Sequence, residues 1–404
     1  MNVKCGEPRR LAMVDRERLR RISGDIAIVG VGDTDYAEDY TRARSGSAYE
    51  DCYGYGARAF RRALEDCGLG REDIDGLIVG PTLSSERTGE ILGINPSWSS
   101  QADSVNAVLQ GALALHSGVA ECIALVYGND QRTAGTKYGG PTARGEQFLS
   151  YVYYAPWGMT SQGALYAMMV RRYMELQGLR PEHLAEVALA QRQFAQLNPN
   201  AVMRDPVDLP TYLGAKYICD PLRIFDYCLV NDGGVALIMT TVQRAKTLKK
   251  KPVVISGIGR NDMNKDATSL WPRLMDFYHT SHARAAAEVY DMAGLGPSDI
   301  DVVGIYDSFS PHVVFALEGF GFFKPGEFAK FSAGGTMRPG GRLPVNTSGG
   351  HLSESYMQGW NHQVELVRQL RGEAGERQVP GARKGQYLSD VAGKAISIIY
   401  SAPS

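Results

Sequence analysis

A group of small, polar and titratable side chains runs from Val345 to Gly359, V-N-T-S-G-G-H-L-S-E-S-Y-M-Q-G. Glycines such as Gly349 and Gly350 let a backbone approach a ligand closely, although the same residues can simply form a turn. Tyr356 adds a phenol, whose ordinary pKa of about 10 must be perturbed before it can act as a base near neutral pH. This segment is therefore the first candidate for a site that binds a ligand and moves protons.

A second tyrosine ends a short apolar run. The stretch from Val302 to Tyr306 has the length and composition of a buried strand, and Asp307 follows it directly. Asp307 is expected either to orient Tyr306 or to end the strand. The chain has 21 tyrosines, so the alternative for each is a structural residue with its ring in the core and its hydroxyl at the rim.

The elements that position these residues include an internal duplication. Residues 68–75, G-L-G-R-E-D-I-D, resemble residues 294–301, G-L-G-P-S-D-I-D. A helical pattern precedes each copy, at 47–66 and 281–292, and a strand-like run follows it. The glycine ends the helix, and the D-I-D step leads into the strand.

A weaker match follows in the same order. Residues 122–127, C-I-A-L-V-Y, resemble residues 395–400, A-I-S-I-I-Y, and helices are expected before them at 104–117 and about 360–371. Such continuous apolar runs favour strands buried on both faces. Further strands are expected at 26–31, 235–240 and 252–258. Together these patterns predict a layered, duplicated α/β protein.

The predicted organisation has an N-terminal arm at 1–21, a first half at 22–245 and a second half at 250–404. A charged segment, K-T-L-K-K-K at 246–251, is expected to form the exposed link. The first half carries an insertion at about 129–215, which is expected to cover a site and shape its pocket. Two helices are expected in it, at 160–177 and 182–196. It also contains an aromatic cluster, namely Tyr151, Tyr153, Tyr154 and Trp157.

Composition excludes several classes of protein. The 404 residues are 44% hydrophobic and 22% charged with a net charge of -1, which fits a soluble globular protein without a general attraction to nucleic acid or anionic membranes. The sequence has no run of about 18 or more apolar residues, so no membrane-spanning helix is expected. The N-terminus lacks the apolar core of a signal peptide. The six cysteines lack metal-type spacing, so free thiols in a reducing cytoplasm are expected.

Two weaker motifs, for a dinucleotide site and for a metal site, are incomplete in this sequence. Gly30-Val31-Gly32 follows a strand but lacks the third glycine of a dinucleotide fingerprint, so a tight turn is expected. His279 and His282 are three residues apart near a helix start without a supporting third ligand, so no metal site is predicted.

The order of elements, the duplication, the N-D-G-G-V-A run at 231–236 and the loop at 346–359 together resemble the thiolase superfamily. The resemblance covers almost the whole chain from about residue 24 and is greatest to the sterol-carrier-protein or lipid-transfer-protein branch. It implies a thiolase-like five-layered α-β-α-β-α sandwich built from two duplicated halves. It also implies a coenzyme A thioester as substrate and no covalently bound cofactor.

The sequence departs from thiolases at the positions that carry thiolase chemistry. The expected start of the helix before 120–122 reads Gln101-Ala102-Asp103-Ser104, where thiolases have a nucleophilic cysteine. The C-terminal segment 397–404 also lacks the second cysteine. In addition, Tyr356 and Tyr306 occupy the histidine positions of the G-H and H-D-C-F motifs.

This pattern resembles the thiolase-fold aldolases of steroid side-chain degradation, in which the residues corresponding to Tyr306 and Tyr356 form the catalytic pair. The S-E-x-Y-x-x-G pattern at 353–359 is shared with them. The resemblance implies a carbon–carbon lyase that splits a β-hydroxyacyl-CoA, such as a steroid side-chain thioester, into a ketone and a shorter acyl-CoA without a cysteine nucleophile. We expect Tyr306 to act as the base and Tyr356 as the acid or enolate donor.

The same alignment gives candidate binding residues. Asn346, Ser348, Gly349 and Gly350 match the thiolase N-P-S-G-G run and are expected to contact the thioester. His351 is expected either to contact the ligand or to pack within the loop.

Partners and alternatives follow from the resemblance. It implies a homodimer joined to a small acyl-CoA-associated partner with a zinc ribbon and an OB-fold. Two other functions remain open at this point: an acyltransferase or condensing enzyme that uses another nucleophile, and a non-catalytic acyl-CoA or lipid-binding subunit.

Overall fold

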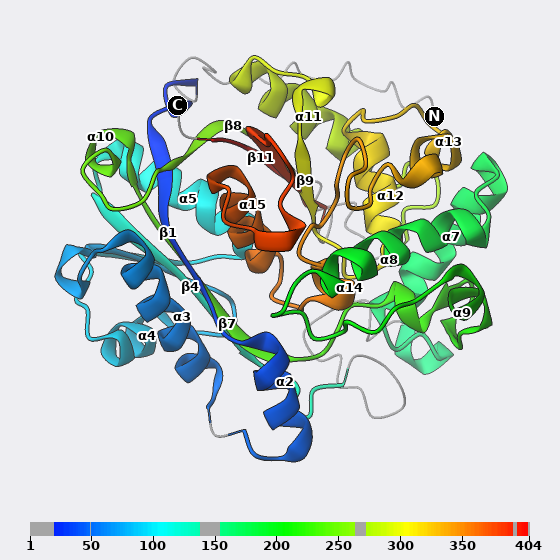
Figure 1. Ribbon diagram of the computed structural model, residues 1–404, viewed down its shortest axis with the longest axis horizontal. Helices are drawn as coiled ribbons and strands as arrows, with labels where there is room; N and C mark the ends of the chain where they lie inside the picture. The colour runs from blue at the N-terminus through cyan, green and yellow to red at the C-terminus, as the bar shows by residue number, and fades with distance from the viewer. Residues whose placement is uncertain (1–19, 49, 138–153, 263–271, 391–393, 403–404) are drawn as a thin grey trace, which may run out of the picture.

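The computed structural model describes residues 20–48, 50–137, 154–262, 272–390 and 394–402, in which strands and helices alternate (Figure 1). The strands are β1 Ile26–Asp33, β2 Gly76–Val79, β3 Trp98–Gln101, β4 Cys122–Asp130, β5 Tyr217–Cys219, β6 Leu222–Arg223, β7 Asp232–Thr241, β8 Val253–Asp262, β9 Val302–Ile305, β10 Lys384–Ser389 and β11 Lys394–Ser401. The helices are α2 Tyr36–Ser45, α3 Cys52–Cys67, α4 Ser85–Leu92, α5 Ser104–Ser117, α7 Gln162–Gln177, α8 Pro181–Gln196, α9 Leu209–Gly214, α10 Val242–Ala245, α11 His279–Ala293, α12 Ser310–Gly319, α13 Phe328–Ser332, α14 Gly350–Ser353 and α15 Trp360–Arg371.

The duplication is visible in the order of the strands. In the described residues, nine strands form one sheet in the order β3-β2-β4-β7-β1-β8-β11-β10-β9, and β5 and β6 pair separately. The first half contributes β2-β4-β7-β1 and the second half the matching series β9-β10-β11-β8, with the same parallel and antiparallel pairings. The two series meet where β1 pairs with β8, through Ala27 with Val254 and Ile28 with Val253.

Helices complete the five layers that the resemblance implied. Helix α3 packs on β1, β4 and β7 on one outer face, and α11 packs on β8 and β11 on the other. Helices α5 and α15 contact strands of both halves, so they form the central layer; Figure 1 shows them between the two sets of strands. The fold is therefore the predicted α-β-α-β-α sandwich.

One expected correspondence was wrong. Residues 122–127 lie in β4 and residues 395–400 in β11, but β4 holds the place that β10 holds in the second half. Both β4 and β11 are buried on both faces, which gives them similar apolar sequences without equivalent positions.

The expected turn at Gly30 and Gly32 was also wrong, because both residues lie inside β1. A Cβ at Gly30 would lie 2.4 Å from the Ala63 carbonyl oxygen, and one at Gly32 would lie 2.2 Å from the Ala59 carbonyl oxygen. These glycines let α3 approach the strand closely.

The central layer is fixed by caps and by aromatic packing. Asp103 caps α5 by accepting a hydrogen bond from the backbone N–H of Asn106, which satisfies one of the unpaired donors at the helix start. Trp360, at the start of α15, is fully buried and stacks on Tyr127 of β4 with ring centroids 5.8 Å apart. Burial of such side chains contributes about 2 to 3 kcal/mol each and holds α15 against both halves.

The helices expected at 160–177 and 182–196 are observed as α7 and α8. Helix α8 packs on α12, α13 and α14, next to the loop around Gly350. The expected arm lies outside the described residues up to position 19, as do Tyr151 and Tyr153 of the aromatic cluster. No helix among the described residues is long and apolar enough to cross a membrane.

Candidate active site

The hydroxyl groups of Tyr306 and Tyr356 lie 3.0 Å apart, although 50 positions separate them in the chain. Tyr306 directly follows β9, and Tyr356 lies in the loop between α14 and α15. The hydrogen bond between them makes one continuous path for a proton across the two phenols.

Both tyrosines line a cavity of about 270 Å³. Three further segments supply the rest of its described lining, at the start of α7, before β7 and after β9: Ser161, Gln162, Gly163, Tyr227, Cys228, Val230, Ser308 and Phe309. The walls are mostly apolar, with few polar groups beside the phenols, which is the usual character of a site for a small organic ligand.

Tyr306 is held by its strand. Its backbone N–H donates to the Leu388 carbonyl oxygen of β10 (2.9 Å). The Asn346 side chain holds Ile305, the residue before Tyr306: it accepts from the Ile305 N–H (2.7 Å) and donates to the Ile305 carbonyl oxygen (3.1 Å). Asn346, expected to contact the thioester, is buried and uses its amide to extend β9 instead of lining this cavity.

Tyr356 is held from the first half of the chain. The Asn231 side-chain oxygen accepts from the Tyr356 N–H (2.7 Å), and the Asn129 side chain donates to the Tyr356 carbonyl oxygen (3.2 Å). Asn231 opens the N-D-G-G-V-A run noted in the sequence, so that motif positions one of the two phenols.

Asp307 is a buried anchor for the loop. Both of its carboxylate oxygens accept from the His351 N–H (3.1 Å each), and one accepts from His362 Nε2 (2.7 Å). These hydrogen bonds account for the closeness of the three side chains, which are also the one group of possible metal ligands in the described part of the chain. Asp307 therefore supports the loop that carries Tyr356.

His351 lies between the two phenols. Its ring centroid is 5.0 Å from that of Tyr306 and 4.9 Å from that of Tyr356. Burial, reinforced by the nearby His362, lowers the pKa of His351 well below its ordinary value, so the ring is neutral. Its Nε2 accepts from the Gly359 N–H (2.8 Å), which fixes the loop end. Of its two expected roles, these contacts favour packing within the loop.

Gly349 and Gly350 both have positive φ, +109° and +59°. A Cβ at Gly350 would lie 2.5 Å from a carboxylate oxygen of Asp307, and one at Gly349 would lie 2.9 Å from the Ala195 Cβ. The pair therefore serves a tight turn over Asp307, and neither residue lines the cavity described above.

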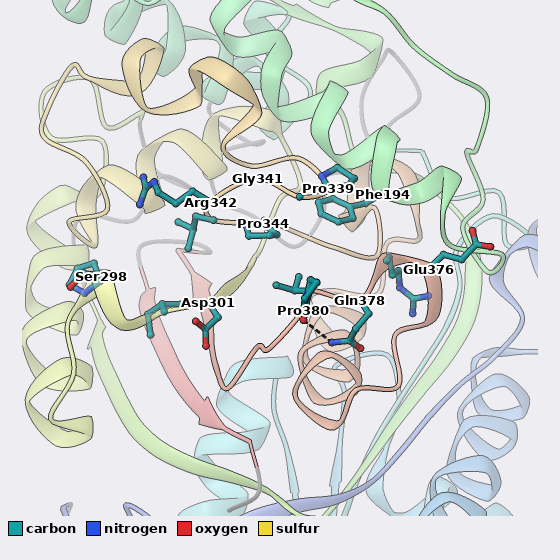
Figure 2. Close-up of a pocket in the computed structure, with 16 residues that line it drawn as sticks. Phe194, Ser298, Asp301, Pro339, Gly341, Arg342, Pro344, Glu376, Gln378 and Pro380 are labelled. Carbon is teal, nitrogen blue, oxygen red and sulfur yellow. Dashed lines mark hydrogen bonds between the residues drawn. The ribbon is translucent and has the colours of Figure 1, made fainter.

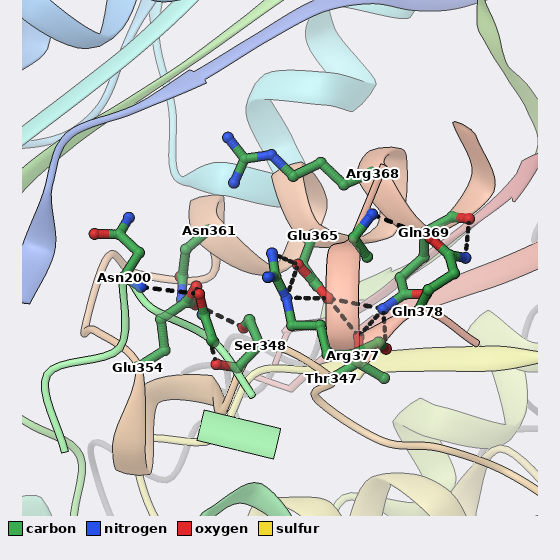
Figure 3. Close-up of polar contacts among 12 residues, drawn as sticks. Asn200, Thr347, Ser348, Glu354, Asn361, Glu365, Arg368, Gln369, Arg377 and Gln378 are labelled. Carbon is green, nitrogen blue, oxygen red and sulfur yellow. Dashed lines mark hydrogen bonds and ion pairs between the residues drawn. The ribbon is translucent and has the colours of Figure 1, made fainter. Parts of the chain in front are cut away.

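Ser348 belongs to a buried polar network beneath the loop (Figure 3). Glu354 accepts from Ser348 (2.6 Å), Asn361 (2.8 Å) and Asn198 (3.0 Å). Beside it, Glu365 pairs with Arg377 at 2.9 Å. Burial, followed by the charge of Glu365, raises the pKa of Glu354 to about 7. Ser348 thus supports the loop from below.

Burial raises the pKa of Tyr306 well above its ordinary value, and the hydrogen bond with Tyr356 offsets only part of this effect. A phenol in this state keeps its proton at neutral pH. This environment favours Tyr306 as a proton donor, which is the reverse of the expected assignment.

Cys228 lines the cavity, although no motif in the sequence pointed to it. Burial, reinforced by the negative charge of Asp307, raises the pKa of its thiol to about 12. The nucleophile in cysteine chemistry is the thiolate, so this thiol is in an unreactive state at neutral pH. Helix α5, where thiolases carry their nucleophile, begins instead with a buried Ser104.

A larger cavity of about 640 Å³ lies at the other end of β9 (Figure 2). Its rim includes Ser298, Asp301, Pro339 and Gln378. Asp301 precedes β9 whereas Tyr306 follows it, and α/β proteins bind ligands at the carboxyl ends of their strands. The carboxylate of Asp301 already accepts from the backbone N–H of Lys384 (2.8 Å). The smaller cavity is therefore the candidate active site.

Comparison with known proteins agrees with the fold described above. Residues 266–399 match the family described as Thiolase C-terminal domain-like. The chain is 31% identical over 373 residues to the 17-hydroxy-3-oxo-4-pregnene-20-carboxyl-CoA lyase of Mycobacterium tuberculosis, covering 87% of this chain and 92% of the relative. It is also 31% identical over 372 residues to the steroid side-chain-cleaving aldolase of Thermomonospora curvata, covering 87% and 91%.

Solved structures give the same result. The Ltp2-ChsH2(DUF35) aldolase superposes with a TM-score of 0.84 at 29% identity, covering 94% of this chain and 98% of that chain. Human mitochondrial 3-ketoacyl-CoA thiolase in complex with CoA has a TM-score of 0.68 at 14% identity, with coverage of 94% and 98%, which is a likeness of fold.

Proposed function

The chain belongs to the thiolase superfamily as a carbon–carbon lyase of that fold, and from this we propose that it is an acyl-CoA retro-aldolase that uses Tyr306 and Tyr356 as its acid–base pair. It splits a β-hydroxyacyl-CoA into a ketone and a shorter acyl-CoA without a cysteine nucleophile. The observation that carries the proposal is the 3.0 Å contact between two phenols at the wall of one cavity.

The substrate class is inferred from chemistry and from the names of the relatives. The compound in the name of the Mycobacterium tuberculosis lyase has a hydroxyl group on the carbon β to its thioester carbonyl, which is the arrangement that a retro-aldol cleavage needs. Phe309, Tyr227 and Val230 give the cavity an apolar wall suited to a hydrocarbon ring. We therefore propose a β-hydroxyacyl-CoA with a bulky ring, such as a steroid side-chain thioester.

The proton balance can be closed with the two phenols alone. The β-hydroxyl gives its proton to the Tyr356 oxygen, Tyr356 gives its own to Tyr306, and Tyr306 protonates Cα. The Cα–Cβ bond breaks, a ketone leaves, and the thioester carbonyl holds the electrons as an enolate until Cα is protonated. Neither phenol has to exist as a phenolate, which suits the raised pKa of Tyr306. Hydroxyl groups aimed at the enolate stabilise it by about 3 kcal/mol each.

The test is substitution of each phenol by phenylalanine. Tyr306→Phe and Tyr356→Phe should each lower kcat by about 10²- to 10⁴-fold, the range for loss of a general acid or base, measured as ketone release from 17-hydroxy-3-oxo-4-pregnene-20-carboxyl-CoA. Tyr53→Phe is the matched control, since its hydroxyl accepts from the Ser84 N–H in the outer layer (3.2 Å). Full activity of both site variants would overturn the assignment.

Cys228 gives the acyltransferase or condensing-enzyme alternative a concrete nucleophile. With its pKa raised to about 12, we expect Cys228→Ser to keep turnover within about threefold, because a protonated thiol is a poor nucleophile. Intact mass after incubation with the acyl-CoA should show no covalent adduct. An acyl adduct that disappears in Cys228→Ser would favour acyl transfer over the aldolase.

We further propose that the chain works as a homodimer with a small zinc-ribbon and OB-fold partner. The similar solved aldolase is named Ltp2-ChsH2(DUF35), which pairs the aldolase with a DUF35 component. Activity should therefore be assayed with and without such a partner. Tight binding of the acyl-CoA with no turnover in either case would support a non-catalytic binding subunit.

A further inference from the structure

Ser308 connects the cavity to a buried imidazole. It lines the same cavity as the two phenols and is partly exposed. Its Oγ lies 3.0 Å from Nε2 of His312, which is four residues later, in the first turn of α12. The link is local, since a residue just before a helix and one in its first turn lie side by side.

The other nitrogen of His312 has a fixed partner. Its Nδ1 lies 2.5 Å from a carboxylate oxygen of Asp390, just after β10, and both side chains are 1% exposed. Burial alone would raise the pKa of Asp390, but its interactions with His312 and His282 lower it overall. An ionised carboxylate only accepts, so Nδ1 of His312 carries the proton and donates it.

These partners fix the direction of the whole chain of bonds. In the neutral imidazole that has its proton on Nδ1, Nε2 is an acceptor, so the Ser308 hydroxyl donates to it. The lone pairs of Ser308 are then left to accept from a hydroxyl in the cavity. This is the same order of roles that activates serine in Ser-His-Asp sites.

The surroundings hold the imidazole in place. The Tyr166 ring from α7 lies 4.2 Å from it, centroid to centroid, and the Tyr306 ring lies 5.8 Å away. On the far side of Asp390, Nε2 of His282 from α11 lies 3.3 Å from the second carboxylate oxygen. Tyr166 also hydrogen-bonds Tyr278 (3.2 Å).

We propose that Ser308, His312 and Asp390 form the base of the cleavage step, leaving the two phenols to serve the enolate. This inference rests on the proposed aldolase function and replaces its simplest form, in which the phenols do both tasks. Ser308 is the group that contacts the substrate, and His312 and Asp390 act through it.

The step balances with the groups present. The β-hydroxyl proton passes to Ser308 as the Ser308 proton passes to Nε2 of His312, which becomes an imidazolium paired with Asp390. The Cα–Cβ bond breaks, the ketone forms, and Tyr306 protonates Cα and is reprotonated by Tyr356. His312 then returns its proton through Ser308 and the cavity to Tyr356, which restores every group. A ketone has no proton to donate to Ser308, so product is held less well than substrate.

The experiment compares kcat and KM for ketone release from the same thioester. Ser308→Ala and His312→Gln should lower kcat by about 100-fold or more, while KM stays within about threefold, because a general base acts in the transition state. Ser308→Thr, which keeps the hydroxyl, should recover most of the rate. Asp390→Asn, which can hold the other tautomer of His312, should behave like His312→Gln.

His282→Gln is the matched control. His282 contacts the same carboxylate and is as buried as His312, but among the described residues no hydrogen bond joins it to Ser308. His282→Gln removes one of the two partners of Asp390 but leaves the bonds from Ser308 through His312 intact, so it should lower kcat much less than His312→Gln if the relay, rather than packing around Asp390, is what matters. Thermal melting of all variants separates loss of fold from loss of chemistry.

The outcomes separate the two proposals. If the wild-type chain releases ketone and Ser308→Ala and His312→Gln do so at full rate, the relay is wrong and the phenols suffice. Equal losses in His282→Gln and His312→Gln would also overturn it, since packing would then be the cause. If the wild-type chain with its partner releases no ketone, the aldolase proposal itself falls and takes the relay with it.

Discussion

At the scale of single residues, the environment of each polar group decides which half of a proton transfer it can perform. Tyr306 is buried against its partner phenol, and its raised pKa favours the protonated phenol. Cys228 lines the same cavity, yet its raised pKa keeps it a neutral thiol. Residue type alone would have allowed either group to act as a base or nucleophile, so burial and partners assign the roles.

Glu354 provides a prediction about stability. Its pKa rises from an ordinary 4.5 to about 7 on folding, because burial and the charge of Glu365 both disfavour the ionised form. The folded chain therefore holds this proton more tightly than the unfolded chain. Stability falls as pH rises from about 4.5 to 7, by about 3 kcal/mol for a shift of this size, and stays lower above it.

The measurement is the free energy of unfolding of the wild-type chain and of Glu354→Gln at pH 5 and pH 8. Glu354→Gln removes the titrating group, so its stability should change less over this interval, by about 2 to 3 kcal/mol. Equal pH dependence in both proteins would contradict the assigned shift.

At the scale of elements, α7 sets one wall of the cavity through a residue with no side chain. Gly163 is the second residue of α7, and a Cβ there would lie 2.6 Å from the Tyr227 ring. Real Cβ atoms do not approach so closely, so Gly163→Ala must displace Tyr227, which lines the same cavity. The helix itself would accept alanine, which has a higher helix propensity than glycine.

We therefore expect Gly163→Ala to fold normally but to lower kcat/KM for a ring-bearing thioester by about tenfold, the cost of misfitting about one methyl group in a pocket. Thermal melting and steady-state kinetics check the two parts of this prediction. Gly214→Ala, where a Cβ meets nothing within 4 Å, is the control. A loss of activity for smaller thioesters as large as for ring-bearing ones would show that the cavity wall is not what changed.

At the scale of the whole molecule, the parts that could be predicted are those that depend on local pattern. The repeat of G-L-G with D-I-D predicted the duplication, because each copy encodes the same helix end and strand start. The match between residues 122–127 and 395–400 predicted a wrong correspondence, because β4 and β11 are both buried on both faces and so have similar compositions without being equivalent. Tyr306 and Tyr356 were recognisable from two short motifs in a familiar framework.

The rest of the site depends on contacts between distant elements. Ser308 and His312 are four residues apart at the start of a helix, a spacing that can be recognised in the sequence. Asp390, which hydrogen-bonds the other nitrogen of His312, is 78 positions further along the chain and could not be assigned to them. Asn346 and Ser348 matched a binding motif, yet their partners, Ile305 and Glu354, make them part of the framework of the loop. Spacing along the chain cannot distinguish these roles, because the partner of each polar group is set by packing.

In the described part of the chain, the sheet continues from one half to the other through two residue pairs between β1 and β8. Across this junction, Tyr227 and Cys228 come from one half, while Tyr306 and Tyr356 come from the other. Neither half alone supplies both this wall and the two phenols. The chamber is therefore complete only when the two halves are folded against each other, so a variant that loosens their contact should lose turnover before either half unfolds.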